Sequence, residues 1–210
     1  RFENVAGVLH DHSAGVIAAK KTLSALRKIS LRNGIDLYEE TKVLDMNPFC
    51  SPIQIDTTRG TLKTNRLIIT AGPWASLLVP FLKPQLTVAR QTVGYFRLSG
   101  SPETYKVGQF PVWGNLGSKR DKIFYGLPQY GQEGIKIARH ITSGVNDNPN
   151  LEKEIASESI EDLVSFINTN FVPRIDRFLG AETCFYTNTS KENFILDLHP
   201  DNPEIAIGAG

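Results

Sequence analysis

Cysteine and long apolar runs are scarce in this chain of 210 residues. It has two cysteines, Cys50 and Cys184, which do not make a disulfide framework, so we expect a reducing compartment. No run approaches the roughly 18 apolar residues that span a membrane, and no segment has the pattern of a secretory signal peptide. These absences argue against a secreted disulfide scaffold and against a membrane protein.

An excess of either charge is also missing. Lysine and arginine total 23 against 22 aspartates and glutamates, and the formal net charge is +1. A surface without a positive excess argues against a nucleic-acid partner. No group of His, Cys, Asp and Glu has the spacing of a metal site, so we expect no metal. Hydrophobic residues make up 40% of the chain, an ordinary share for a globular protein.

The sequence has no G-x-G-x-x-G, the glycine pattern that places a dinucleotide's pyrophosphate at a helix N-terminus. Gly208-Ala209-Gly210 comes nearest to it, but no helix follows these residues. The chain starts with Arg1 rather than methionine, and residues 205–210 have the pattern of a buried strand entering a glycine turn. We therefore expect the chain to be an internal part of a longer protein.

Periodic apolar residues in the first 82 positions predict helices and strands. One helix is expected over 16–32, with Ser13 as its N-cap and Asn33-Gly34 as its stop. Strands are expected over 35–45, 53–58 and 62–70. A proline-bracketed loop after the first strand holds Cys50, which we interpret as structural. A short helix is expected over 74–82.

From residue 85 the pattern changes to short strands separated by glycine and proline. An antiparallel sheet is predicted, with strands over 86–98, 110–113, 122–125 and 135–141. A helix follows, beginning at Ser157 or Ser159 and ending before Pro173. Its apolar residues recur at helical spacing and predict packing against the sheet: Ile160, Leu163, Val164, Ile167 and Phe171.

The predicted strand after Gly180 combines two chemically active side chains. Its residues alternate, so that Cys184 and Tyr186 face one side while Phe185 faces the other. A thiol and a phenol on one face, about 6–7 Å apart along the strand, are not ordinary core filling and raise the hypothesis of a chemical role. The alternative is an ordinary buried thiol, since free cysteine is among the most buried residue types.

Three motifs resemble the monomeric sarcosine oxidase family. They are Cys-x-Tyr-Thr-x-Thr from Cys184, Phe-Ile-x-Asp-x-His-Pro from Phe194, and Ile-Gly-Ala-Gly from Ile207. Members of this family are FAD-dependent amine oxidases of the D-amino-acid-oxidase and glutathione-reductase-like class. The resemblance implies part of an α/β FAD-binding domain over 1–82 and 181–210. It implies an α+β substrate domain, an antiparallel sheet flanked by helices, over 83–180.

The resemblance also implies the site residues. In this family the motif cysteine carries the flavin through a thioether to its 8α carbon, which gives Cys184 this role. Tyr125, His140 and Tyr186 take catalytic positions near the flavin and the substrate amine. An imidazole or a phenol there can hold or deprotonate the cationic amine before hydride loss. Further FAD contacts are implied for Val43, Ala71, Gly72, Trp74, Gly208 and Gly210.

Some positions depart from the family pattern. Gly114 stands where some members have a bulky apolar residue in the substrate cavity, which predicts a wider cavity here. Phe124 replaces a tyrosine of some members. The cations that clamp the substrate carboxylate, and the lysine that assists oxygen reduction, are expected outside these 210 residues. We interpret His199, which belongs to the second motif, as structural.

The resemblance implies oxidation of the C–N bond of an N-methyl or cyclic secondary amino acid, such as sarcosine or pipecolate. A hydride passes to covalent FAD, and electrons then pass to oxygen to give hydrogen peroxide. The expected partners are the amino acid and oxygen, and the full-length protein is expected to be a monomer in the peroxisome or cytoplasm.

Two alternatives to this function stay open. One is a non-catalytic module that binds a small molecule. The other is an FAD dehydrogenase or demethylase with a protein electron acceptor. Because the 210 residues lack the glycine fingerprint, we expect that by themselves they neither bind FAD tightly nor oxidise an amine.

Overall fold

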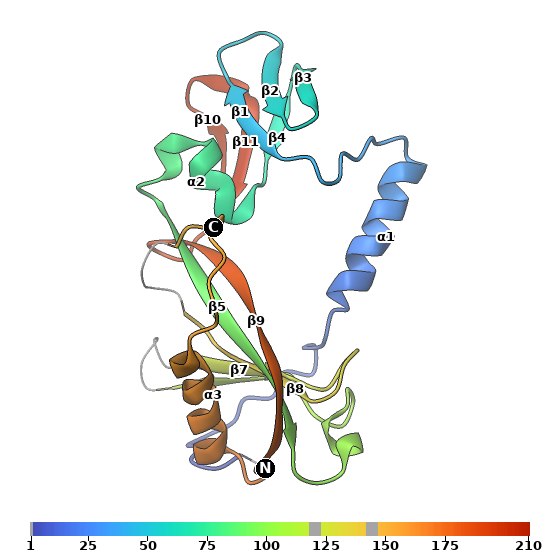
Figure 1. Cartoon of the computed structure of the whole chain (residues 1–210), viewed down its shortest axis with the longest axis vertical. Coiled ribbons are helices and arrows are strands. Elements are labelled where there is room, and N and C mark those ends of the chain that lie inside the picture. The colour runs from blue at the N-terminus through green and yellow to red at the C-terminus, as the bar shows by residue number, and fades with distance from the viewer. Residues whose placement is uncertain (1, 118–122, 142–146) are drawn as a thin grey trace. The chain divides into compact units, whose positions relative to one another are not determined.

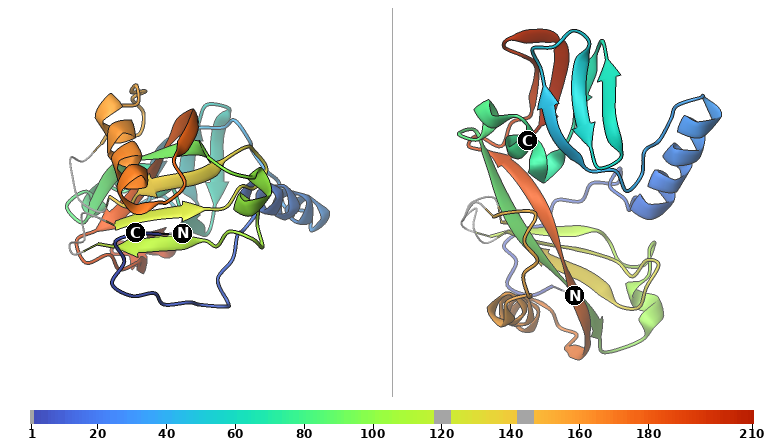
Figure 2. Two further views of the ribbon diagram at one scale, coloured as in Figure 1. Left: turned by 90° about the horizontal axis from the view of Figure 1, so that it is seen from below. Right: turned by 45° about the horizontal axis from the view of Figure 1, so that its top comes forward.

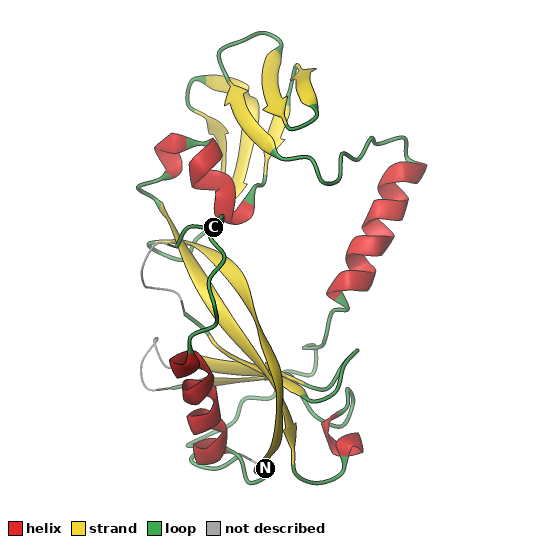
Figure 3. Cartoon of the chain, viewed as in Figure 1, coloured by secondary structure: helices red, strands yellow, loops and turns green. Residues whose placement is uncertain are grey.

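The computed structural model describes residues 2–117, 123–141 and 147–210 (Figure 1). They form a mixed α/β fold in which strands outnumber helices (Figure 3). The chain divides into two compact units: the first holds the residues up to Val16 and Val88–Tyr186, and the second holds Ile17–Thr87 and Thr187–Gly210. Cys184 and Tyr186 fall in the first unit. The assignment of an FAD-binding and a substrate domain stays a prediction.

The first unit is built on a five-stranded sheet with the strand order β6-β7-β8-β5-β9. Its strands are β5 (Leu86–Leu98), β6 (Trp113–Leu116), β7 (Ile123–Leu127), β8 (Ile135–Arg139) and β9 (Ile175–Thr189). Strands β6, β7, β8 and β5 pair antiparallel in turn, as the sequence predicts. A short helix, η3 (Pro102–Tyr105), follows β5.

The predicted apolar stripe of α3 (Ser157–Asn170) packs on one face of this sheet. Leu163 and Ile167 are almost completely buried, and Phe166 stacks on Phe124 of β7 with ring centroids 4.1 Å apart. Burial of side chains of this size stabilises the fold by about 1.5–3 kcal/mol each. This apolar layer therefore fixes α3 against the sheet, and Figure 1 shows the helix beside the strands.

The alternation of side chains along the strands shows which residues lie on the face of the sheet away from α3. Phe124 and Ile137 belong to the core under α3, so Tyr125 and Lys136 point to the other side. We call this second face, away from α3, the site face. The cross-strand partners of Tyr125 and Lys136 share it, and they are Gly114 and Tyr95.

The second unit contains two small sheets that share a core (Figure 2). The first is antiparallel and comprises β1 (Val43–Asn47), β2 (Ile53–Thr57) and β3 (Gly60–Thr64). In the second, β11 (Asn202–Ala209) pairs antiparallel with β10 (Ile195–His199) and parallel with β4 (Leu67–Ile69). The segment expected as one helix over 74–82 is η1 (Gly72–Trp74), α2 (Ala75–Leu78) and η2 (Pro80–Leu82).

The first helix starts later than predicted. α1 spans Ala19–Arg32 with Ala18 as its N-cap, and Ser13 is not a cap because its hydroxyl donates to the Asp11 carboxylate at 2.7 Å. The predicted stop is confirmed, since the helix ends before Asn33 and Gly34 has a φ of 74°. α1 buries none of its side chains.

Two strand predictions in the second unit are wrong in extent. Residues 35–45 form a strand only from Val43, because Glu40 has a φ of 53°, which an extended strand does not hold. The stretch 62–70 is two strands, since β3 pairs with β2 whereas β4 pairs with β11 in the other sheet.

Strand boundaries in the first unit also differ from those predicted. The strand expected over 110–113 begins only at Trp113, because Pro111 has no amide hydrogen and the Phe110 amide donates to Lys106 in a turn. β8 ends at Arg139 rather than at 141, and β9 begins at Ile175, before Gly180. Residue 122, expected in β7, lies outside the described residues.

Candidate active site

The three residues predicted to be catalytic meet on the site face. The Tyr125 hydroxyl of β7 lies 3.2 Å from the Tyr186 hydroxyl of β9, a hydrogen-bonding distance. The His140 ring, just beyond the end of β8, has its centroid 5.3 Å from that of the Tyr186 ring. All three side chains are partly buried. Three strands thus contribute an imidazole and two phenols to one small region.

Two phenols of this face, those of Tyr125 and Tyr95, stay protonated at neutral pH. Burial, and then the hydrogen bond to Tyr186, raise the pKa of Tyr125 well above the ordinary value for tyrosine. Burial, and then a hydrogen bond to the Glu182 carboxylate, raise the pKa of Tyr95 to about 12. Tyr125 and Tyr95 are therefore hydrogen-bond donors rather than bases in neutral solution.

The Cys184 thiol lies on β9 two residues before Tyr186, and it is exposed. The pKa of this thiol is raised overall. Partial burial is the largest cause, the positive charge of Lys136 partly offsets it, and the negative charge of Glu182 adds to it. Strand alternation puts Glu182, Cys184 and Tyr186 on one side of β9. An accessible sulfur therefore stands among charged groups and phenols on the site face.

Sequence reasoning did not single out three polar residues of this face: Tyr95, Lys136 and Glu182. Tyr95 donates to Glu182, and Lys136 pairs with Tyr95 across β5 and β8. One signal was available for Lys136. It precedes His140 by four residues, an even spacing that puts both on the same side of an extended chain.

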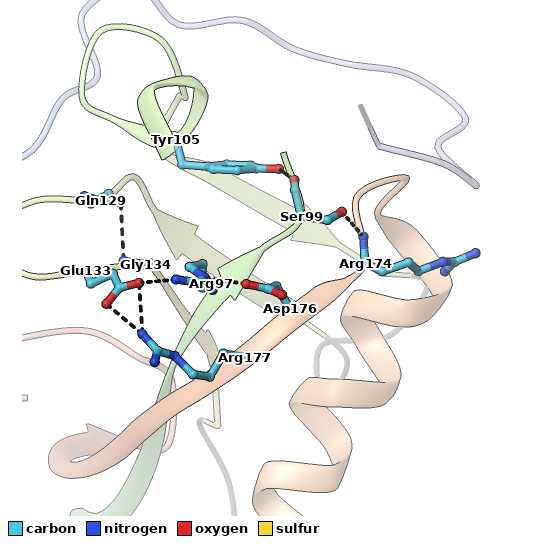
Figure 4. Close-up of polar contacts among 9 residues, drawn as sticks. All are labelled: Arg97, Ser99, Tyr105, Gln129, Glu133, Gly134, Arg174, Asp176 and Arg177. Atoms are coloured by element: carbon cyan, nitrogen blue, oxygen red, sulfur yellow. Dashed lines mark hydrogen bonds and ion pairs between the residues drawn. The ribbon is translucent and has the colours of Figure 1, made fainter. Parts of the chain in front are cut away.

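The hairpin of β7 and β8 carries Tyr125, Lys136 and His140, and its loop is tied to the neighbouring strands through Glu133 (Figure 4). The Glu133 carboxylate accepts hydrogen bonds from Arg97 of β5 at 3.2 Å and from Arg177 of β9 at 3.1 Å. Exposed ion pairs of this kind add little stability, because water and salt screen them. The two arginines nevertheless attach the loop to two different strands and orient the hairpin.

Gly134 lets the same loop approach β5 closely. Its φ is 81°, and a Cβ at this position would lie 2.6 Å from the backbone oxygen of Phe96. Its amide donates to the Gln129 side chain at 3.3 Å (Figure 4). No other residue type fits this position without moving the backbone.

Five residues predicted to contact FAD, four of them small and one a tryptophan, lie at one edge of a sheet in the second unit. Parallel pairing of β4 with β11 brings the segments that follow Ile69 and Ile207 to the same carboxyl edge. A Cβ added to Gly208 would lie 3.3 Å from the Thr70 methyl group, whereas one added to Gly72 would have no atom within 4 Å. The predicted residues of this edge are Ala71, Gly72, Trp74, Gly208 and Gly210.

Dinucleotides bind at the carboxyl ends of parallel strands, so these small residues fit backbone contacts to FAD. Val43, the remaining predicted contact, begins β1 in the other sheet of the same unit.

The remaining candidates have structural environments. His199 is buried, its Nδ1 accepts a hydrogen bond from the Asp201 amide, and its ring makes an edge contact with Phe81. Cys50 is half-buried in the loop that joins β1 to β2. Within the described ranges, no group of His, Cys, Asp and Glu has an arrangement that holds a metal. No described helix is both long and apolar enough to cross a membrane.

A thiol, two phenols and an imidazole on one sheet face, together with small residues at the carboxyl edge of parallel strands, are the features of a flavoprotein oxidoreductase. Comparison with known proteins agrees with this class. The model of the FAD dependent oxidoreductase family matches residues 1–210, and the chain belongs to this family.

Sarcosine oxidases are among its relatives. The chain is 35% identical over 224 residues to the peroxisomal sarcosine oxidase of Homo sapiens, an alignment that covers 100% of this chain and 56% of that protein. It is 28% identical over 207 residues to the monomeric sarcosine oxidase of Bacillus sp. (strain B-0618), covering 96% of this chain and 52% of the relative. The chain thus spans about half the length of the curated relatives it matches.

Solved structures of amine and amino acid oxidases share the fold. Fructosamine oxidase (Amadoriase II) of Aspergillus fumigatus matches with a TM-score of 0.71 at 19% identity, over 91% of this chain and 46% of that one. The amino acid oxidase NikD, of nikkomycin biosynthesis, matches with a TM-score of 0.70 at 18% identity, over 91% and 51%. The predicted family and mixed α/β fold are therefore confirmed.

Proposed function

We propose that this protein oxidises the C–N bond of an N-methyl or cyclic secondary amino acid, with FAD as hydride acceptor and oxygen as the final electron acceptor. The observation that carries the proposal is the meeting of Tyr125, His140 and Tyr186 on the face that presents Cys184. Relatives named as sarcosine oxidases and N-methyl-L-tryptophan oxidases support N-methyl amino acids as the substrate class.

FAD, when bound, supplies the hydride acceptor and passes the electrons to oxygen. Cys184 would hold its ring covalently, because the sulfur is exposed on the site face. The small residues at the carboxyl edge of β4 and β11 would contact the dinucleotide through their backbones.

His140 would accept the proton of the substrate amine. A secondary amine is cationic at neutral pH, and its lone pair is needed before hydride leaves the neighbouring carbon. Tyr125 and Tyr186 would orient the nitrogen by hydrogen bonding, since their hydroxyls already meet at 3.2 Å and the raised pKa of Tyr125 keeps its proton in place.

Lys136 would favour the transfer of electrons to oxygen. Its charge reaches the Cys184 sulfur, the point at which the flavin would be attached. Reduced oxygen is anionic, and a fixed cation beside the place where it forms stabilises it. The lysine for this step, expected outside the chain, would then lie within it.

The proposed reaction is tested on the purified full-length protein, of which these 210 residues are expected to be a part. Sarcosine, pipecolate or N-methyl-L-tryptophan should bleach the flavin absorbance without oxygen, and air should restore it with formation of an equal amount of hydrogen peroxide. Glycine, which lacks the N-methyl group, is the control. Reoxidation only by an artificial acceptor would indicate a dehydrogenase, and a protein without flavin bands would indicate a non-catalytic binding module.

A peroxisomal or cytoplasmic location and a monomeric state complete the proposal. The Homo sapiens and Mus musculus relatives are named peroxisomal, which supports the first of these two locations.

Gly114 is expected to set the width of the substrate cavity. It pairs with Tyr125 on the site face, and no atom lies within 4 Å of a Cβ added there. Gly114→Leu should therefore fold normally and lower kcat/KM for N-methyl-L-tryptophan by about tenfold relative to sarcosine. Steady-state kinetics with both substrates measure the ratio. An equal change for both would show that Gly114 does not face the substrate.

A further inference from the structure

Gln91 is a polar side chain buried completely inside the first unit. It lies on β5 with 0% of its surface exposed. Its amide nitrogen donates to the backbone oxygen of Ile141 at 2.7 Å, and its amide oxygen accepts from the Ile141 backbone nitrogen at 3.0 Å. One side chain therefore satisfies both backbone groups of a residue 50 positions away.

The pairing register of β5 and β8 explains why the Gln91 side chain bonds to the Ile141 backbone. Val93 pairs with Ala138 across β5 and β8, so two residues further along the same register Gln91 stands opposite His140. β8 ends at Arg139. The Gln91 amide thus replaces backbone hydrogen bonds at the point where the regular strand stops.

His140 is consequently fixed from both sides although it lies outside the strand. On one side its own amide donates to the Ile123 oxygen of β7 at 2.8 Å. On the other side the next residue, Ile141, is held by Gln91. Its ring contacts the Tyr186 ring, and that contact depends on where this short piece of backbone lies.

We propose that Gln91 is a positioning residue that holds His140 against Tyr186 through the backbone of Ile141. The proposal rests on the catalytic role given to His140 above. Gln91 is not expected to touch the substrate or FAD. Its loss would leave two partly buried backbone groups of Ile141 without these partners, and new partners would require the segment that carries His140 to move.

Gln91→Met tests the proposal, because methionine fills a similar volume without either hydrogen bond. Flavin reduction by the amine should slow about tenfold to a hundredfold, the range expected when a reacting group moves by about 1 Å. Tyr105→Phe is the matched control: it removes a buried hydrogen bond to the Ser99 oxygen at the other end of β5. It should leave the reduction rate unchanged.

Gln91→Glu separates positioning from a general loss of stability. A protonated carboxyl group can donate to the Ile141 oxygen and accept from its amide, whereas a carboxylate cannot donate. Burial raises the pKa of such a carboxyl group. The reduction rate should therefore approach that of the parent protein at low pH and fall as pH rises through this pKa. Dividing the rate of the variant by the rate of the parent at each pH removes the effect of the titratable groups that both proteins share.

The position of His140 is read directly from the NMR signal of its ring, which the Tyr186 ring shifts. In Gln91→Met this shift should be lost, and in Tyr105→Phe it should remain. An unchanged shift in Gln91→Met overturns the inference. The NMR shift tests only the position of the His140 ring, so this outcome does not depend on whether His140→Ala shows a catalytic role. A lost shift supports the inference in either case, so its failure and that of the proposed function are distinguishable.

Discussion

Cys184→Ser is expected to abolish covalent flavin and leave the fold intact. Serine is nearly isosteric and the Cys184 side chain is exposed, so the packing cost is small. The hydroxyl is a far poorer nucleophile than a thiolate, and attack on the flavin 8α carbon should fail. After acid denaturation, all the flavin of Cys184→Ser should pass through a filter that retains the protein, whereas the parent protein should stay yellow.

Cys50→Ser is the matched control, because it removes the other cysteine, which lies in a loop of the second unit. It should retain all of the covalent flavin. A parent protein that releases its flavin on denaturation would contradict the covalent link. Retention of flavin by Cys184→Ser would place the link at another residue.

His140→Ala is expected to lower the rate of flavin reduction by the amine on the order of 10²-fold while the flavin stays attached. This is the usual contribution of a positioned acid or base. Rapid mixing with sarcosine in the absence of oxygen measures this rate separately from reoxidation. An unchanged rate would show that His140 is only structural.

Lys136→Met provides the contrast, because Lys136 lies on the same face four residues before His140. It should leave the reduction by the amine close to that of the parent and slow the reoxidation by oxygen, the opposite pattern to His140→Ala. Slower reduction in both variants would show that the two residues act together on the substrate.

Elements with a complete local signal were predicted well from the sequence. β5 matches its predicted range of 86–98, because its apolar run is bounded by Pro84 on one side and Gly100 on the other. α3 matches because its apolar residues keep helical spacing over three turns, and Leu163, Val164 and Ile167 join the core beneath the helix. In both elements, apolar residues that the sequence pattern identifies pack in the core.

Elements that depend on a distant partner were predicted less well. Residues 35–42 have the composition of a strand, but the structure places Ile35 in an exposed position and gives this segment no strand pairing. The stretch 62–70 divides because its two halves join different sheets. Local sequence carries no information about either outcome.

The site residues also divide into those with a local sequence signal and those that depend on a distant partner. The family motifs identify Cys184, Tyr125, His140 and Tyr186, and strand alternation explains why two residues of β9 face the same way. The bond from Gln91 to Ile141 joins positions 50 residues apart and has no signature in either segment. Glu182 lies beside the motif cysteine, but only the structure shows that it accepts from Tyr95.

The alternation of β9 limits how this site can diverge during evolution. Cys184 and Tyr186 share one side, while Phe185 faces the other, where Arg90 lies 4.5 Å from its ring. A substitution changes one of these side chains and leaves the others in place. An insertion or deletion of a single residue before Cys184 would exchange the two sides of everything that follows in the strand. New substrate preferences should therefore arise among homologues by replacement of residues along β9, and differences in length should be confined to the turn at 190–194.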